Sequence, residues 1–298
     1  MKVLLAVSGG IDSMYLAERA PELFPGASFA VAHCNFRLRG AESDGDETFV
    51  REWCSRKGLP SFVKHFDTSS YAAANGISIE MAARDLRYAW FAELCASEGF
   101  DCVAVAHNAD DNAETFFLNI LRGTGASGLR GMGDRGMIVR PLLGIPRSEI
   151  RNWMEARNLA WREDSSNSSS AYKRNRLRKE VIPVLKEMNP SLLESLQRTM
   201  LHVAQVDDIA DEYFRSVRDS VFVGEAISVP ALLKLEHPRY VLFRLVEPAG
   251  LTETALDNLW ELINSGRHLA GKTFVGKSGV VKGRAKWRLV LENLDKNC

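Results

Sequence analysis

The sequence lacks paired cysteines, long apolar runs and an excess of charge of either sign. Its five cysteines are scattered, and no two of them form a C-x-x-C pair. This spacing argues against a disulfide framework or a cysteine zinc site and favours reduced thiols in the cytoplasm. No stretch approaches the roughly 18 apolar residues of a membrane helix, and the apolar run at residues 2–7 is too short for a signal peptide. We therefore expect a cytoplasmic protein with no membrane partner.

The charges of the chain are balanced, because 38 basic residues are matched by 38 acidic ones. Net charge therefore gives no sign of a nucleic-acid partner, and any basic surface must be local. A length of 298 residues predicts about two domains. The sequence does not decide whether the chain forms a homodimer.

The first half of the chain alternates short apolar runs with longer amphipathic segments. The apolar runs predict buried parallel strands at residues 3–7, 28–34, 61–66 and 102–106. The amphipathic segments predict helices at residues 13–20, 42–57 and 79–98. This order predicts an α/β fold with a doubly wound parallel sheet, in which ligands bind beyond the carboxyl ends of the strands.

Helical spacing dominates the second half. A serine-rich loop is expected at 165–172. Asn189 and Pro190 are expected to begin one long helix or two in succession. Another helix is expected over about 252–266, and short β-structure at 273–291. We place a catalytic domain at residues 1–185 and a C-terminal domain at 186–298. The second domain is expected to combine a helical linker with a smaller α+β region.

A glycine corner follows the first predicted strand and opens the first helix. It consists of Ser8, Gly9, Gly10, Ile11, Asp12 and Ser13. The two glycines let backbone amides approach an anion, and the amides and dipole of a helix start favour negative charge. Asp12 is suited to a Mg²⁺ ion that bridges phosphate oxygens. A plain turn capped by Asp12 or Ser13 is the alternative, but the complete motif between strand and helix favours a phosphate site.

This corner resembles the PP-loop of the ATP pyrophosphatases, since it matches S-G-G-x-D-S at every defined position. It is not a Walker A motif, because the Gly-Lys-Ser/Thr ending is missing. The resemblance implies a fold of the adenine nucleotide alpha hydrolase type. It also implies that the protein grips the pyrophosphate of ATP while a substrate oxygen attacks the α-phosphate, so that an adenylate forms and a nucleophile then displaces AMP.

Further segments resemble those of the tRNA(Ile)-lysidine synthetases. They lie at residues 33–39, 42–44, 83–88, 106–115, 122–125, 140–143, 163–167 and 174–178. The resemblance implies a ligase that uses ATP and Mg²⁺ to adenylate the C2 oxygen of the wobble cytidine in tRNA(Ile) with a CAU anticodon. The ε-amine of free L-lysine then bonds to C2 and releases AMP. The modified tRNA reads AUA instead of AUG, and residues 186–298 are expected to contact it.

Acidic residues and one histidine are the first candidates for the chemistry. Asp12, Asp111 and Glu114 are the expected Mg²⁺ ligands, because Asp111 and Glu114 share a helix face and carboxylates beside a polyphosphate need a cation. A capping-box helix start is the alternative for the last two. His107 either contacts the reacting phosphate or substrate or is a structural histidine. Asp111 is also a candidate for a direct catalytic role.

Basic residues form two further candidate groups. Arg84 and Arg87 lie one turn apart and either stabilise charge as phosphate leaves or belong to the surface, where Arg84 can pair with Glu80. A basic run is expected to contact the RNA backbone, although a solvated helix face is the alternative. Its members are Lys173, Arg174, Arg176, Arg178 and Lys179.

Two other kinds of PP-loop enzyme and one protein of a different class compete with this interpretation. A tRNA thiolase with an iron–sulfur cluster would need paired cysteines, which the sequence lacks. A small-molecule synthetase would not need the basic run. A nucleotide-binding regulator without turnover would have little use for the three carboxylates.

Overall fold

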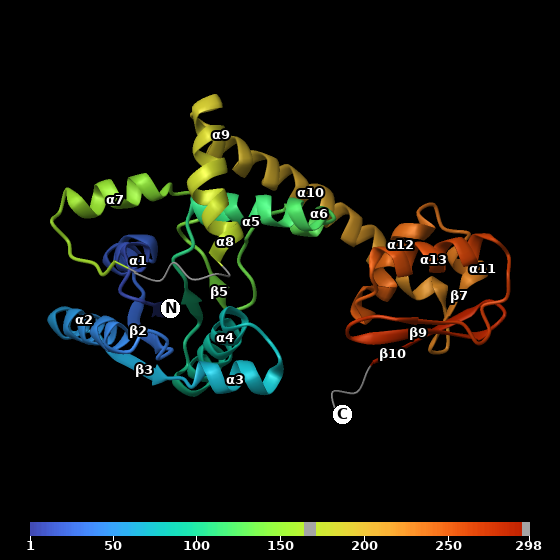
Figure 1. The fold of residues 1–298 in the computed structure, drawn as a ribbon, viewed down its shortest axis with the longest axis horizontal. Coiled ribbons are helices and arrows are strands. Elements are labelled where there is room, and N and C mark those ends of the chain that lie inside the picture. The colour runs from blue at the N-terminus through green and yellow to red at the C-terminus, as the bar shows by residue number, and fades with distance from the viewer. Residues whose placement is uncertain (164–170, 294–298) are drawn as a thin grey trace. The chain divides into compact units, whose positions relative to one another are not determined.

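The computed structural model describes residues 1–163 and 171–293. The chain divides into two compact units, Met1–Ala204 and Gln205–Cys298 (Figure 1). The serine-rich loop predicted at 165–172 lies outside the described residues up to Ser170, and its last two residues already belong to helix α8.

A five-stranded parallel sheet forms the centre of the first unit. Its strands are β1 (Lys2–Ala6), β2 (Ser28–Asn35), β3 (Ser61–His65), β4 (Cys102–Ala104) and β5 (Ile138–Val139). Their order is β3-β2-β1-β4-β5, and every pair of neighbours is parallel. The chain therefore winds outward from β1 in one direction and then returns to wind the other way. This confirms the predicted doubly wound sheet, although β5 was not predicted.

Helices cover both faces of this sheet. They are α1 (Ile11–Leu23), α2 (Ala41–Lys57), α3 (Thr68–Asn75), α4 (Ile79–Glu98), α5 (Ala109–Arg122), α6 (Ala126–Leu129) and α7 (Arg147–Glu155). Alternation along β1 directs Val3 and Leu5 into a core shared with α1, α2 and α7, whereas Leu4 enters the core beneath α4. Each fully buried side chain of this kind contributes ~1.5–3 kcal/mol.

The predicted boundaries of several helices need correction. Helix α1 begins directly after Gly10, two residues before the predicted start at Ser13. Helix α4 has the predicted bounds, since the Ser78 hydroxyl caps its start and Gly99, with φ of 69°, ends it. Helix α3 was not predicted, because its short sequence is mostly alanine, serine and asparagine and shows little apolar periodicity.

A run of helices begins at Ala171. It consists of α8 (Ala171–Arg176), a π-helical turn η1 (Leu177–Val181), α9 (Ile182–Met188) and α10 (Leu192–Val217). Helix α10 is a single helix of 26 residues, and it begins after the predicted start. The Asn189 side chain accepts a hydrogen bond from the Ser191 amide, so Asn189 caps the turn that precedes α10.

The second unit combines an antiparallel sheet with three α-helices. The strands are β6 (Phe222–Val223), β7 (Ala226–Ser228), β8 (Thr273–Val275), β9 (Gly279–Ala285) and β10 (Arg288–Asn293), in the order β6-β7-β10-β9-β8. The helices are α11 (Val229–Leu232), α12 (Pro238–Val246) and α13 (Glu253–Asn264), with 3₁₀ turns η2 (Arg218–Val221) and η3 (Glu247–Ala249). Leu242, Leu259 and Leu289 lie in its buried core. This unit confirms the predicted α+β character.

Within the described ranges of the whole chain, no helix has the length and apolar content that crossing a membrane requires.

Candidate active site

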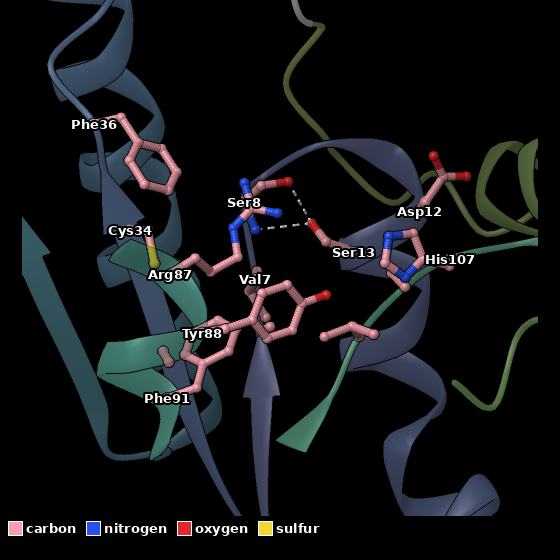
Figure 2. Close-up of a pocket in the computed structure, with 14 residues that line it drawn as sticks. Val7, Ser8, Asp12, Ser13, Cys34, Phe36, Arg87, Tyr88, Phe91 and His107 are labelled. Carbon is pink, nitrogen blue, oxygen red and sulfur yellow. Dashed lines mark hydrogen bonds between the residues drawn. The ribbon is translucent and has the colours of Figure 1, made fainter. Parts of the chain in front are cut away.

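The predicted nucleotide site lies at the carboxyl ends of β1 and β4, where the winding of the sheet changes direction. A pocket of about 360 Å³ opens there, and it is lined by the glycine corner, the ends of β1, β2 and β4, and helix α4. The Arg87, Tyr88 and His107 side chains are directed into it (Figure 2). Phe36 and Phe91 add aromatic surface. Doubly wound sheets bind nucleotides at the point where the strand order reverses.

The glycine corner is held in place by its own serine side chains. The Ser13 hydroxyl accepts hydrogen bonds from the Ser8 and Gly9 amides at 3.1 and 3.2 Å and donates one to the Gly10 carbonyl at 2.9 Å. Figure 2 shows the contact between Ser8 and Ser13. Gly9 has φ of 94°, which is strained for any residue with a side chain. These bonds and the Gly9 backbone conformation fix the shape of the corner.

Backbone donors remain at the start of α1. The first helical hydrogen bond is donated by the Met14 amide to the Gly10 carbonyl at 3.0 Å. The amides of Ile11, Asp12 and Ser13 precede this bond, as the first amides of any helix do. They are the natural donors to an anion at the corner.

Asn108 joins two of the predicted carboxylates. Its side-chain amide donates to Asp12 Oδ1 at 3.0 Å, and its side-chain oxygen accepts from the Asp111 amide at 3.0 Å. The Asp111 carboxylate in turn accepts from the Asn108 amide at 3.2 Å, which completes a capping box. The sequence suggested a box formed by the Asp111–Glu114 spacing, but Asn108 is the capping residue. Its position one residue before the helix was the available signal.

Burial and charge act together on Asp12. Desolvation raises the pKa of its carboxyl, and the neighbouring Asp111 raises it further. Arg147, whose guanidinium lies 3.9 Å from Asp12 Oδ2, and the Asn108 hydrogen bond lower it. Two carboxylates that disfavour each other's charge are a suitable environment for a cation.

Glu114 is already neutralised by arginine. Its side chain is fully buried, and Arg178 binds both oxygens, with Nε 2.6 Å from Oε1 and a terminal nitrogen 3.1 Å from Oε2. Arg174 Nε lies 3.3 Å from Oε2. Desolvation raises the pKa of Glu114, and the bond to Arg178 opposes that rise. Arg178 also contacts Asp111 Oδ1 at 3.2 Å.

These contacts decide how well a Mg²⁺ ion fits. Asp12 belongs to the glycine corner and is linked through Asn108 to Asp111. Arg178 contacts one Asp111 oxygen at 3.2 Å without the two-oxygen contact that it makes with Glu114, so these two aspartates fit the ion better. Glu114 is engaged by Arg178 and would have to exchange partners in order to bind a metal. Over residues 1–163 and 171–293, no group of three or more Asp, Glu, His or Cys side chains is arranged to hold a metal. The three-carboxylate site stays a prediction, and the geometry favours two of its members.

His107 lies in the pocket as a neutral imidazole. Burial lowers its pKa to about 4, and Arg140, Arg84 and Arg87 lower it further against the opposing effect of Asp111. Arg140 Nε donates to His107 Nδ1 at 3.3 Å. Because Nδ1 accepts this bond, the neutral ring carries its proton on Nε2. His107 is therefore equipped to donate a hydrogen bond.

The two arginines of α4 differ in position. Arg87 lines the pocket, and its guanidinium lies 5.3 Å from the centre of the Phe36 ring. Arg84 is not part of the described pocket lining, and its guanidinium lies 4.9 Å from the centre of the Tyr88 ring. Contact with an aromatic face holds a guanidinium without neutralising it.

The basic run is divided between two environments. Arg174 and Arg178 turn toward Glu114, whereas Lys173, Arg176 and Lys179 are exposed. Asp110, which from the sequence could only be interpreted as part of a helix cap, anchors the surrounding elements: it accepts from Lys186 Nζ at 2.7 Å and from the Arg147 amide at 2.8 Å. No sequence pattern joined these distant residues to Asp110.

Residues 1–185 match the PP-loop domain, which accounts for the glycine corner and the sheet beneath it. The chain belongs to the PP-loop family. The corner at residues 8–13, which matches the S-G-G-x-D-S pattern, is called the PP-loop below.

Curated relatives resemble the chain beyond the PP-loop domain. A tRNA(Ile)-lysidine synthase of Bacteroides thetaiotaomicron is 38% identical over 290 residues, which cover 97% of this chain and 65% of the relative. The protein of that name from Porphyromonas gingivalis W83 is 41% identical over 278 residues, covering 93% of this chain and 60% of the relative. The chain thus spans about 60 to 65% of the length of these relatives.

A solved structure shows the same fold. The U34-tRNA thiolase of Methanococcus maripaludis superposes with a TM-score of 0.57 at 19% identity, covering 69% of this chain and 73% of the thiolase. The thiolase structure contains a [4Fe-4S] cluster. Among the described residues of this chain, the cysteines are the free thiols Cys34, Cys54, Cys95 and Cys102.

Proposed function

We propose that this chain acts in the cytoplasm as a tRNA(Ile)-lysidine synthase, an ATP-dependent ligase that joins free L-lysine to C2 of the wobble cytidine of tRNA(Ile) with a CAU anticodon. The observation that carries the proposal is 38% identity to a curated enzyme of that name over 97% of this chain. The pocket beside the PP-loop supports it, because it offers a nucleotide both aromatic surface and anion donors.

In the first step, the cytidine C2 oxygen attacks the α-phosphorus of ATP. A bond forms from this oxygen to phosphorus, and the bond from phosphorus to the leaving pyrophosphate breaks. The amides of residues 11–13 bind phosphate oxygens, and Arg87 places positive charge where the phosphoryl group is transferred. Asp12 and Asp111 would hold the Mg²⁺ ion, which supplies positive charge to the triphosphate when it is bound.

In the second step, the lysine ε-amine attacks C2 of the adenylated base. A carbon–nitrogen bond forms, the carbon–oxygen bond breaks, and AMP leaves with the former cytidine oxygen while the amine loses a proton. His107 donates a hydrogen bond from Nε2 to a phosphate oxygen of the departing AMP, a role that its neutral state permits. Lys173, Arg176 and Lys179 are the exposed members of the basic run and would contact tRNA phosphates, Arg176 by exchanging its surface partner Glu180.

The decisive experiment is ATP–pyrophosphate exchange with purified components. We expect exchange that requires tRNA(Ile) with a CAU anticodon, and lysine incorporation that mass spectrometry finds at the wobble cytidine. Initiator tRNA(Met), which also has a CAU anticodon, is the matched control and should remain unmodified. An Asp12→Asn variant should lose exchange. Exchange with no need for tRNA would contradict the proposal in favour of a small-molecule synthetase, and sulfur at the cytidine would favour a thiolase.

A further inference from the structure

A left-handed turn follows strand β2 at the rim of the nucleotide pocket. Arg37 has φ of 53°, a conformation that crowds the Cβ of an arginine against its own carbonyl oxygen. Phe36, directly before it, lines the pocket (Figure 2). Because neighbouring Cα atoms are only about 3.8 Å apart, Arg37 lies at the edge of the pocket that Phe36 helps to form.

A buried side chain holds this turn in place. Asn35 is 1% exposed, and its side-chain oxygen accepts a hydrogen bond from the Arg37 amide at 3.0 Å. Its side-chain nitrogen donates to Asp44 Oδ1 at 3.1 Å and to Glu47 Oε2 at 3.0 Å. His65 Nε2 lies 2.6 Å from the same oxygen of Glu47. The Asn35 side chain therefore has a fixed orientation, and it imposes the left-handed conformation on Arg37.

The residue before Arg37 is held from the other side of the turn. The Phe36 carbonyl accepts from the Thr68 hydroxyl at 3.1 Å, and the Phe36 ring stacks on Phe66 with 5.4 Å between the ring centres. The conformation of Arg37 is thus fixed by contacts on both sides. Backbone strain that the surrounding structure maintains in this way is concentrated at binding and catalytic positions.

The positive charge of Arg37 is not used inside the protein. Its side chain is exposed and forms no ion pair with a carboxylate of residues 1–163 and 171–293. The neighbouring Asp67 accepts instead from the Ser70 hydroxyl at 2.7 Å and the Ser70 amide at 3.1 Å. These bonds lower the pKa of Asp67, and the charge of Arg37 lowers it further. Arg39, two residues along, is bound to Asp46 at 2.7 Å, so the two arginines of this segment differ in availability.

A cytidine that attacks the α-phosphate of ATP must enter the pocket, and it brings the phosphates of its own strand to the rim. We propose that Arg37 binds an RNA phosphate next to the wobble cytidine. The inference rests on the proposed function, because it assigns a contact to the tRNA at the reacting nucleotide. A guanidinium suits this position, since it can donate parallel hydrogen bonds to a phosphate. Such a contact fixes the register of the RNA strand over the pocket.

Binding of tRNA(Ile) at a series of salt concentrations tests the charge of Arg37. Arg37→Gln should weaken binding about five- to tenfold near ~0.1 M salt and reduce the salt slope by about one, because one phosphate contact is lost. Arg56→Gln is the matched control. Arg56 is an exposed arginine of the last turn of α2, roughly 20 Å along the helix from the turn at Arg37, and its removal should change neither quantity.

A neutralised phosphate locates the contact on the RNA. A tRNA(Ile) with uncharged methylphosphonates on both sides of the wobble cytidine should bind the wild-type protein more weakly than unmodified tRNA does. It should bind Arg37→Gln no more weakly than unmodified tRNA does, because the interaction is already absent. If the two changes added independently, Arg37 would contact a different phosphate and the inference would be wrong.

The strained backbone supplies a second measurement. Glycine adopts φ of 53° without strain, so Arg37→Gly should melt at a higher temperature than Arg37→Gln while it binds tRNA equally weakly. The same melting curves establish that each variant is folded. A residue whose backbone strain serves binding should thus gain stability and lose affinity when it is replaced by glycine.

Affinity and salt slope equal to wild type in folded Arg37→Gln would overturn the inference and leave Arg37 as a solvated side chain. A raised KM for lysine with tRNA binding intact would also overturn it, because the guanidinium would then bind the lysine carboxylate. These outcomes are distinguishable from failure of the proposed function. Lysidine formation with unaffected Arg37 variants would remove the inference alone, whereas Arg37-dependent tRNA binding without lysidine would remove the proposed activity and keep the RNA contact.

Discussion

Two groups of arginines that look alike in the sequence meet different partners in the fold. On α4, Arg84 and Arg87 lie over aromatic rings, and neither forms an ion pair with a carboxylate of the described residues. On α8 and η1, Arg174 and Arg178 converge on the buried Glu114. The first group keeps its positive charge available to a ligand, and the second uses it inside the protein.

The difference shows that a basic run in a sequence is not the same as a basic surface. Glu114 is fully buried, and a carboxylate in such a place must be protonated or paired. Pairing it removes Arg178 from the charges that RNA can reach. Arg84 and Arg87 are not held by a buried carboxylate. Phe36 and Tyr88 hold their guanidinium groups without cancelling the charge.

The largest expected effect comes from removing the available charge in the pocket. Arg87→Ala should reduce the rate of ATP–pyrophosphate exchange by about 10²–10³-fold, as the loss of one preorganised charge at a reacting centre does elsewhere. Arg84→Ala is the matched comparison, because Arg84 is one turn away and outside the described pocket lining. We expect it to cost less than about tenfold. Equal effects of the two variants would remove the distinction between them.

The next largest effect is expected on stability, when the ion pair between Arg178 and the buried Glu114 is broken. Arg178→Ala leaves Glu114 buried without its bidentate partner and should destabilise the fold by about 2–3 kcal/mol in urea unfolding. This is below the usual cost for a buried pair, because Arg178 is 38% exposed and Arg174 remains nearby. The pKa of Glu114 should rise further.

A second substitution sharpens this test. Glu114→Gln combined with Arg178→Met should recover much of the lost stability, because neither side chain then carries a buried charge. If Arg178 instead serves mainly as an RNA contact, Arg178→Ala will leave stability unchanged and lower the salt dependence of tRNA binding.

The sheet and the PP-loop could be predicted because both are local in sequence. Apolar runs identified β1 to β4 within about one or two residues, and the glycine corner lies between β1 and α1 as expected. Strand β5 has only two residues, which is too short for any periodic signal. The start of α10 was placed too early, because Asn189 and Pro190 resemble a helix cap but belong to the preceding turn.

The partners of the site residues could not be predicted, because they depend on contacts between distant segments. Arg178 reaches Glu114 across 64 residues, and Asn108 reaches Asp12 across 96. The sequence supplied the residue types for a metal site, but only the fold shows that Glu114 already has a cationic partner. Likewise, no sequence motif includes Arg147. Its position beside Asp12 follows from the packing of α7 against α1.

A smaller effect is expected on the protonation of His107. Its pKa is about 4, with burial as the main cause and Arg87 as one of the contributing charges. Arg87→Gln should raise that pKa slightly, since a positive neighbour is lost while burial and the larger effects of Arg140 and Arg84 persist. Histidine NMR titration measures the change directly, and a pKa that falls or stays constant would show that the Arg87 charge does not reach the ring.

The same pKa predicts how stability changes with pH. Between about pH 4 and the ordinary histidine pKa of 6.5, the unfolded state binds more protons at His107 than the folded state does. Stability should therefore fall as the pH drops through this window. A His107→Asn variant, which has no ring to protonate, should show a shallower fall in urea unfolding experiments at pH 7 and pH 4.5.

The smallest expected effect is at the exposed end of the basic run. Arg176 pairs with Glu180 at 2.9 Å on the surface, and both side chains are more than half exposed. Glu180→Ala should cost no more than about 0.5 kcal/mol, because solvent screens an exposed pair of this kind. It should also strengthen tRNA binding slightly at low salt, since Arg176 then loses a competing carboxylate.

Arg176→Ala should weaken tRNA binding and reduce its salt slope by about one, in contrast to Arg178→Ala. If the two arginine variants changed stability and tRNA affinity alike, the division of the run into internal and available charge would be wrong.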